Sequence, residues 1–252
     1  MSKNLPRTLA LAVTGLFLLY PLWGLASPVG HWQWAAADTG SALTTSFALT
    51  GVALVIVVAI GTPLAFSLRG ASRGVRIAFE ATVLLSVLMP PLALGLLLAL
   101  AFGPDTALGG LLLRLGIPTS NDATAFVVTQ IYASLGYYLL GAAAAFDAVP
   151  RELERAAALL GLKPHEILWR VTLPLARLGL AAAVSLAWVR ALGEFGAIMV
   201  TAYYPHGIPV QLWVDLQDSG LPAVLPLLLV FLLSALPLPW ALRILSRTRS
   251  HA

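Results

Sequence analysis

The chain contains no cysteine among its 252 residues, which excludes disulfide bonds, thiolate metal sites and a cysteine nucleophile. Charge is also scarce, because Asp, Glu, Lys and Arg together make up 10% of the residues, whereas soluble proteins carry roughly 25%. Hydrophobic residues make up 59%. So few charged residues cannot cover a water-soluble surface, and the composition therefore predicts a protein with several membrane spans.

Catalytic signatures are missing as well. The chain has no Gly-x-x-x-x-Gly-Lys-[Ser/Thr] run, so we expect no P-loop and no ATP hydrolysis by this chain itself. Its Asp and Glu residues are scattered without metal-ligand spacing, and we expect no catalytic residue, no bound metal and no cofactor. The sequence pI of about 9.8 is typical of nucleic-acid-binding proteins. The basic residues, however, are placed as signals of membrane topology, as described below, so we expect no nucleic-acid partner.

Six apolar stretches are long enough to cross the hydrocarbon core, which takes roughly 20 helical residues. The alternating pattern of strands is absent, and helices satisfy their backbone polar groups without water. We therefore predict an all-α integral membrane protein, formed by one transmembrane domain over residues 1–252. The first stretch resembles a signal peptide, but its run from Thr8 to Ala26 exceeds the usual apolar region of roughly 7–15 residues, which favours a retained helix. The predicted spans lie near 8–27, 43–67, 77–103, 123–146, 174–201 and 221–245.

The basic residues predict the orientation. With six spans, thirteen of the fifteen Lys and Arg residues fall on one side of the membrane, whereas Arg114 falls on the other and Arg190 lies inside the fifth span. By the positive-inside rule, we expect a multi-pass protein of the cell membrane with both termini in the cytoplasm. The thirteen are Lys3, Arg7, Arg69, Arg73, Arg76, Arg151, Arg155, Lys163, Arg170, Arg177, Arg243, Arg247 and Arg249.

The connection between the fourth and fifth spans is polar from Asp147 to Arg170. Residues 152–160 have an Ala-rich helical pattern, Gly161 can end that helix, and Pro164 can open a second short helix over 165–170. A helix pair joined by a flexible point suits a groove on another protein, with a membrane-surface loop as the alternative. After Pro209, an amphipathic run predicts a short interfacial helix, with an ordinary loop as the alternative.

This connection also carries a spacing pattern. Ala156-Ala157 is followed after three residues by Gly161, and after nine more by Val171-Thr172-Leu173-Pro174. The spacing resembles the cytoplasmic signature loop of ABC importer permeases, Glu-Ala-Ala, three residues, Gly, nine residues, Ile, any residue, Leu-Pro. The resemblance implies the type I ABC importer permease fold, with a coupling-helix loop at about 148–173 that contacts a separate ATPase. The implied coupling residues are Glu154, Arg155, Ala156, Ala157, Leu160, Gly161, Lys163, Pro164, Leu173 and Pro174.

One position departs from that signature. The family's Glu before Ala-Ala is Arg155 here, and Glu154 lies one place earlier. This departure puts the family's ionic contact with the ATPase in doubt at this position. The Ala-Ala and Gly positions, which set helix packing and the turn, are unchanged.

Further runs resemble the oxyanion branch of these permeases, and molybdate or tungstate permeases in particular. The resemblance implies an ATPase partner that binds ATP-Mg, an extracytoplasmic substrate-binding protein, a second copy of the chain and the lipid bilayer. Sulfate or thiosulfate import by the same machine is one alternative. A proton-coupled secondary transporter that uses Glu194 and a structural membrane scaffold are two others. The runs are Gly61-Thr62-Pro63-Leu64-Ala65, Pro90-Pro91 with Gly95 and Ala101-Phe102-Gly103, Ala191 to Ala197, Ala202-Tyr203-Tyr204-Pro205, and Ser219-Gly220-Leu221.

The candidate pore and gate residues lie in the third and fifth spans. Breaks in a membrane helix such as Pro90-Pro91 are tolerated where the helix is buried in protein or lines a cavity, and Gly95 permits close approach of a helix or a substrate. Arg190 and Glu194 are four residues apart and share one helix face, which favours a structural ion pair; brief contact of Arg190 with the anion is the alternative. The remaining candidates are Phe195, a possible hydrophobic gate, and its flanking residues Gly193 and Gly196.

Overall fold

The computed structural model describes residues 5–26 and 36–248, and all of its regular elements in these ranges are helical. The first half comprises α1 (Leu5–Leu19), a 3₁₀ helix (Tyr20–Ala26), α2 (Ala36–Ser67), a 3₁₀ turn (Leu68–Gly70), α3 (Arg73–Leu88), α4 (Pro91–Phe102), α5 (Ala107–Arg114) and α6 (Ala123–Asp147). The second half comprises α7 (Arg151–Leu159), α8 (Pro164–Ile167), a π-helical turn (Leu168–Thr172), α9 (Leu173–Leu192), α10 (Gly196–Thr201), α11 (Ile208–Ser219), α12 (Leu221–Ala235) and α13 (Pro237–Thr248).

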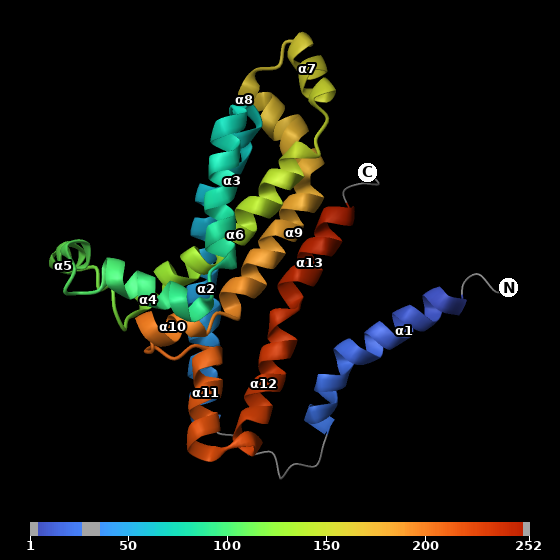
Figure 1. The fold of residues 1–252 in the computed structure, drawn as a ribbon. Helices are drawn as coiled ribbons and strands as arrows, with labels where there is room; N and C mark the ends of the chain where they lie inside the picture. Colours follow the sequence, from blue (N-terminus) through green and yellow to red (C-terminus); the bar gives the residue numbers. More distant parts are fainter. Residues whose placement is uncertain (1–4, 27–35, 249–252) are drawn as a thin grey trace.

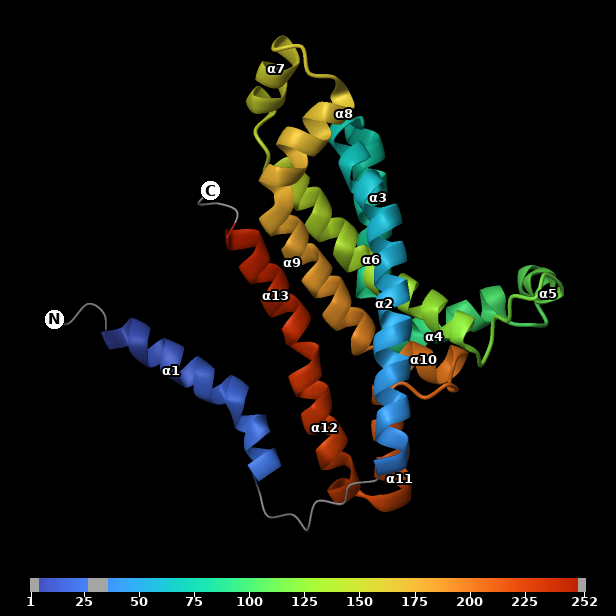
Figure 2. The same cartoon turned by 180° about the vertical axis from the view of Figure 1, so that it is seen from behind.

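The long helices form an elongated bundle (Figure 1). At one end, α7 and α8 cap the bundle next to the start of α3, and at the other end α11 turns into α12. Helices α4 and α5 project sideways from the middle of the bundle, whereas α1 stands apart from it in both views (Figure 2). The short helices α7, α8 and α11 therefore lie at the two ends of the bundle and connect the long helices to one another.

The core of the bundle is the packing of α6 between α2 and α9. Small residues allow α6 and α9 to approach closely, as they do in other membrane helix pairs. A Cβ atom on Gly141 would lie 2.8 Å from the Cβ of Ala183, and one on Gly179 would lie 2.5 Å from the Cβ of Ala145. The two Gly–Ala pairs bring the helix backbones together at successive turns, so larger side chains at these glycines would force the helices apart.

Several polar side chains of the core are paired across helices. The hydroxyls of Thr62 on α2 and Tyr138 on α6 are 2.6 Å apart. Nε2 of Gln130 on α6 donates to Oγ1 of Thr50 on α2 at 2.8 Å and to the carbonyl oxygen of Ala191 on α9 at 3.0 Å. Such bonds are favoured in lipid because no water replaces them, and they tie α6 to both of its neighbours.

The span count agrees with the prediction in a modified form. Five helices are long and apolar enough to cross a membrane, and a sixth span results if α3 and α4 count as one. These two helices meet at an angle of 109°, so the third span predicted over 77–103 is divided into two helices at the predicted break, Pro90-Pro91. The reason is local: Pro90 and Pro91 supply no N–H for the helical ladder, and Pro91 instead opens α4 as its first residue.

The fifth span also differs from its predicted bounds of 174–201. A continuous helical stretch runs from Pro164 to Leu192, because α8, the π-helical turn and α9 follow one another without a break. The π-helical turn ends at Thr172, two residues before Pro174, which has no backbone N–H to donate to the carbonyl one turn back. At the other end, the helix stops at Gly193 and restarts at Gly196 as α10.

The other predicted helices are present. The amphipathic run after Pro209 lies in α11, so the predicted short helix is confirmed. The predicted first helix is present as α1 and the 3₁₀ helix that follows it. Lys3, Arg249 and most of the predicted connection between the first two spans lie outside the described residues.

Candidate functional site

The signature segment folds as the predicted helix, turn and helix. Helix α7 begins after Pro150, and Glu152 and Glu154 lie in its first turn, where negative charge complements the helix dipole. The helix ends at Leu159 with Leu160 as its C-cap, and Gly161 adopts a φ of +87°. That left-handed backbone favours glycine, which explains why this position of the signature sets the turn.

The second helix opens as predicted at Pro164. Oε2 of Glu166 accepts a hydrogen bond from the backbone N–H of Lys163 at 2.9 Å, which satisfies one donor at the helix start. The helix then continues through the π-helical turn into α9. Leu173 and Pro174 are therefore inside one continuous rod, so this rod joins the signature directly to a membrane-spanning helix.

Large apolar side chains on this segment are left uncovered. Leu159 is 89% exposed and Leu160 is 81% exposed at the end of α7, and Trp169 is 70% exposed on the π-helical turn. Large exposed apolar side chains in an otherwise polar segment indicate an interaction surface. Leu160 was predicted among the coupling residues, as an apolar residue in a polar segment, but Trp169 was not.

The departure from the signature has a structural counterpart. Arg155 is exposed on α7, whereas Glu154 is turned towards the membrane domain and pairs with Arg69 at 2.5 Å. The two neighbouring residues thus have opposite surroundings. The carboxylate binds within the chain, and the guanidinium remains on the surface.

Near the other end of α9, the predicted Arg190–Glu194 ion pair forms. Glu194 is fully buried, and Arg190 is partly exposed. The second carboxylate oxygen of Glu194 accepts from the backbone N–H of Ala197 at 2.8 Å, at the start of α10. The Arg190 guanidinium lies 5.7 Å from the ring centroid of Tyr137, which is a cation–π distance. The carboxylate therefore joins the end of α9 to the beginning of α10.

The predicted residues of the third and fifth spans come together at the contact of α4 with α10. A Cβ atom on Gly95 would lie 2.8 Å from Cα of Ala197, and one on Gly196 would lie 2.9 Å from Cβ of Pro91. Gly95 therefore allows a helix to approach. Pro90 and Pro91 are exposed at the bend.

Phe195 occupies the break between α9 and α10, next to the exposed Gly193. Its ring is half-buried and packs on the cluster formed by Phe126, Ile198 and its neighbours. The ring centroid of Trp213 on α11 lies 5.9 Å away. Phe195 thus packs among α6, α10 and α11, and the sequence did not identify Trp213 as its neighbour.

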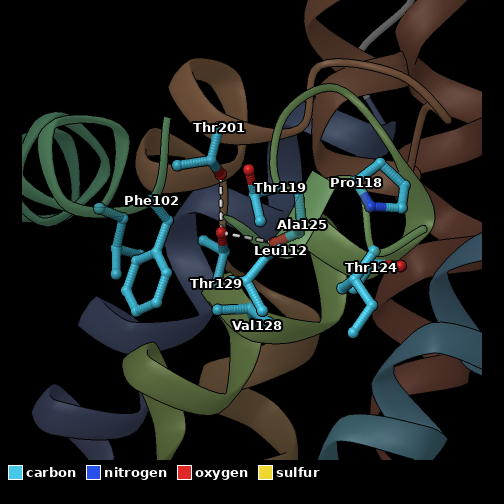
Figure 3. A pocket seen from close by; sticks show the side chains of 11 residues that line it. Phe102, Leu112, Pro118, Thr119, Thr124, Ala125, Val128, Thr129 and Thr201 are labelled. Atoms are coloured by element: carbon cyan, nitrogen blue, oxygen red, sulfur yellow. Dashed lines mark hydrogen bonds between the residues drawn. The ribbon is translucent and has the colours of Figure 1, made fainter. Parts of the chain in front are cut away.

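A cavity of about 70 Å³ lies beside the contact of α4 with α10. It is lined by residues of α4, α5, the α5–α6 connection, α6 and α10 (Figure 3). The hydroxyls of Thr129 and Thr201 point towards one another at 2.7 Å and form a hydrogen bond across it. The sequence did not identify these residues, because isolated threonines in apolar stretches have no pattern. The described residues that line the cavity carry no charge: Leu98, Phe102, Leu112, Ile117, Pro118, Thr119, Thr124, Ala125, Val128, Thr129 and Thr201.

Comparison with known protein families shows which family has this arrangement. The family model of the binding-protein-dependent transport system inner membrane component matches residues 57–251, which include the signature, the bend and the break at Phe195. The chain belongs to this family. It is therefore a multi-pass membrane permease of a binding-protein-dependent transport system, and it is not an enzyme.

Two relatives of this permease resemble it over nearly their whole length. A protein of Haloferax volcanii, named as a probable molybdenum ABC transporter permease, is 36% identical over 240 residues, which cover 91% of this chain and 88% of the relative. The molybdenum transport system permease protein ModB of Mycobacterium tuberculosis is 34% identical over 240 residues, which cover 90% of each chain.

A solved structure shares the fold of the permease. It is that of a bacterial alginate ABC transporter in complex with an alginate-bound periplasmic protein, and its TM-score is 0.74. The likeness covers 97% of this chain and 94% of that chain at 18% identity. The ABC importer permease fold implied by the signature is thus confirmed.

Proposed function

We propose that this permease forms the pore of an ATP-driven importer for molybdate or tungstate. The observation that carries the proposal is the near-full-length similarity to two proteins named as molybdenum permeases. The runs around Pro90, Glu194 and Tyr203, which resemble the oxyanion branch, support the same substrate class. The substrate is then a small tetrahedral dianion, and the pore is formed by two copies of this chain.

Two kinds of protein partner complete the machine. A separate ATPase, which binds ATP-Mg, docks on α7 and α8, where exposed Leu159, Leu160 and Trp169 form an apolar surface. A soluble binding protein delivers the anion to the opposite end, next to α11. The permease itself binds no cofactor in this scheme, and its termini are cytoplasmic.

Transport follows from movement of the continuous rod. Closure of the ATPases displaces α7 and α8, and the π-helical turn passes the displacement to α9. Glu194 carries it on to α10, because this carboxylate binds both Arg190 and the N–H of Ala197. Phe195, at the break between the two helices, then moves with α10 and acts as the gate.

The path holds the anion weakly. Glu194 would repel a dianion, and Arg190 is neutralised by its ion pair. A weak path suits a pore that must release its substrate, so selectivity resides in the binding protein. The same geometry argues against a proton-coupled carrier, because both carboxylate oxygens of Glu194 have partners within the chain.

Uptake into proteoliposomes tests the proposal. The permease is reconstituted with its ATPase and binding protein, and molybdate, tungstate and sulfate compete in one assay. We expect ATP-dependent uptake of molybdate or tungstate that excess sulfate leaves unchanged. Strong competition by sulfate would move the permease to the sulfate branch, and uptake without ATP would contradict the proposal altogether.

A further inference from the structure

The carboxylate of Glu154 joins three segments that are far apart in the sequence. Its Oε1 accepts a hydrogen bond from Nη1 of Arg69 at 2.5 Å and another from the hydroxyl of Thr172 at 2.5 Å. Arg69 lies in the 3₁₀ turn that ends α2, Glu154 lies on α7, and Thr172 is the last residue before α9. One side chain thus connects α7, the coupling helix of the proposed mechanism, to the membrane-spanning helices α2 and α9.

Arg69 is itself held at the junction of α6 and α7. Its side chain is 8% exposed, and Nη2 donates to the backbone carbonyl of Val149 at 2.9 Å. The carbonyl of Arg69 in turn accepts from the guanidinium of Arg151. The arginine is therefore bound to both sides of the short loop that leads into the coupling helix.

Helix α7 has little other attachment to the membrane domain. Within its nine residues, all of which the structure describes, Ala157 is the one that is buried. The ends of the helix continue through Pro150 and the glycine turn. A displacement of α7 therefore reaches the bundle through the chain at its two ends, through Ala157, through the Arg151–Arg69 hydrogen bond and through Glu154.

Thr172 is a suitable receiver for such a displacement. It is fully buried and closes the π-helical turn, and such turns occur frequently at functional sites in helices. A shift of Glu154 would act on the start of α9 through the Thr172 hydroxyl, and on the end of α2 through Arg69. Energetic coupling between distant sites is carried by contiguous networks of this kind when they have two arrangements.

We propose that Glu154, Arg69 and Thr172 form a transmission junction, which passes movement of the coupling helix to α2 and α9. The inference rests on the proposed ATP-driven transport. It concerns positions outside the family signature, since Glu154 precedes the place of the signature's Glu and Thr172 occupies its unspecified position. Glu154 is a positioning residue in this scheme and has no contact with the anion.

The test measures the number of anions imported per ATP hydrolysed, using the full complex in proteoliposomes. We expect Glu154→Gln to retain ATPase binding and ATP hydrolysis but to lower this ratio by about fivefold or more, the lower end of typical coupling between linked sites. Glu152→Gln is the matched control, because it makes the same charge change on an exposed residue of the same helix. The control should keep the ratio of the unmodified complex.

A second pair of variants isolates the connection to α9. Thr172→Val removes the hydroxyl at nearly constant volume, whereas Thr172→Ser keeps it. We expect the valine variant to lower the ratio and the serine variant to preserve it, which a purely volume-dependent structural role would not produce.

The outcomes separate the two proposals. If the unmodified complex imports no anion with ATP, the proposed function fails and the junction fails with it. If the unmodified complex transports but Glu154→Gln keeps its ratio, the junction alone is wrong. Equal losses in Glu154→Gln and Glu152→Gln, or in the valine and serine variants, would also overturn it.

Discussion

At the scale of single residues, Glu194 shows how a charge is accommodated inside an apolar bundle. The residue is fully buried, yet one carboxylate oxygen binds Arg190 and the other accepts the N–H of Ala197. Charged residues at membrane depth usually face the bundle interior and pair in this way. The pair therefore holds the break between α9 and α10 in one geometry.

Removal of Arg190 should affect stability before it affects the anion. We expect Arg190→Ala to destabilise the permease by about 3 kcal/mol, the low end for removing one partner of a buried pair, because Glu194 keeps its charge and loses its counter-ion. The thermal midpoint of the purified permease measures this loss. The apparent KM for anion uptake should stay within about twofold, since a structural ion pair stabilises the protein equally with and without the bound anion.

An exposed arginine supplies the comparison for this variant. Arg114 lies on the surface at the end of α5, and Arg114→Ala should leave the thermal midpoint nearly unchanged. An unaltered midpoint in Arg190→Ala together with a raised KM would instead place Arg190 on the anion's path.

At the scale of elements, the sequence predicted which segments are helical more reliably than how they bend. The apolar runs identified all the membrane-length helices, and Gly161 and Pro164 marked the turn in the coupling segment. The sequence predicted the position of the bend at Pro90-Pro91 but not its angle of 109°, because the angle depends on the contact of α4 with α10. The sequence did not predict that α8 continues into α9. Pro174 indicates the start of a new helix, and the π-helical turn that accommodates this proline has no sequence signature.

Contacts between elements were the least predictable part of the site. Glu154 pairs with Arg69, which lies 85 residues earlier in the chain, and no periodic pattern relates two such positions. Trp169 and the threonines of the cavity were missed for a similar reason. In contrast, Arg190 and Glu194 were found because a spacing of four residues predicts a pair on one helix face, and the pair forms although Glu194 lies just beyond the end of α9.

The α4–α10 contact is open to a direct test. We expect Gly95→Ala to lower both the thermal midpoint and the uptake rate, because its Cβ would lie 2.8 Å from Cα and 2.9 Å from the carbonyl oxygen of Ala197. These are backbone atoms that cannot turn aside, and overpacking of this kind typically costs about 1–3 kcal/mol.

Gly51 on α2 provides the matched substitution. No atom lies within 4 Å of a Cβ built there, so Gly51→Ala should preserve or slightly raise stability through its higher helix propensity. If Gly95→Ala behaves like Gly51→Ala, close packing of α4 on α10 is not what Gly95 provides.

At the scale of the whole molecule, charge and shape agree on an orientation. The basic residues of the α2–α3 turn and the α7–α8 segment gather at one end of the bundle, and the turn from α11 to α12 lies at the other (Figure 1). By the positive-inside rule we expect the first end to face the cytoplasm. The same end carries the exposed leucines of α7, where we propose that the ATPase docks.

The lack of cysteine allows this orientation to be measured without any background substitution. Leu159→Cys introduces a thiol at an 89% exposed position of α7, and Asp218→Cys introduces one at an exposed position of α11. We expect a membrane-impermeant maleimide to label Asp218→Cys in intact spheroplasts, and to label Leu159→Cys only in inside-out vesicles. The unmodified chain should remain unlabelled in both.

A further step links the orientation to the docking surface. Bound ATPase should protect Leu159→Cys from the maleimide in inside-out vesicles, and it should leave labelling of Asp218→Cys in spheroplasts unchanged. Reversed labelling of the two positions would contradict the topology. Labelling of Leu159→Cys that is equally fast with and without the ATPase would keep the topology but remove the end of α7 from the docking surface, and the coupling movement would then have to enter the permease through α8.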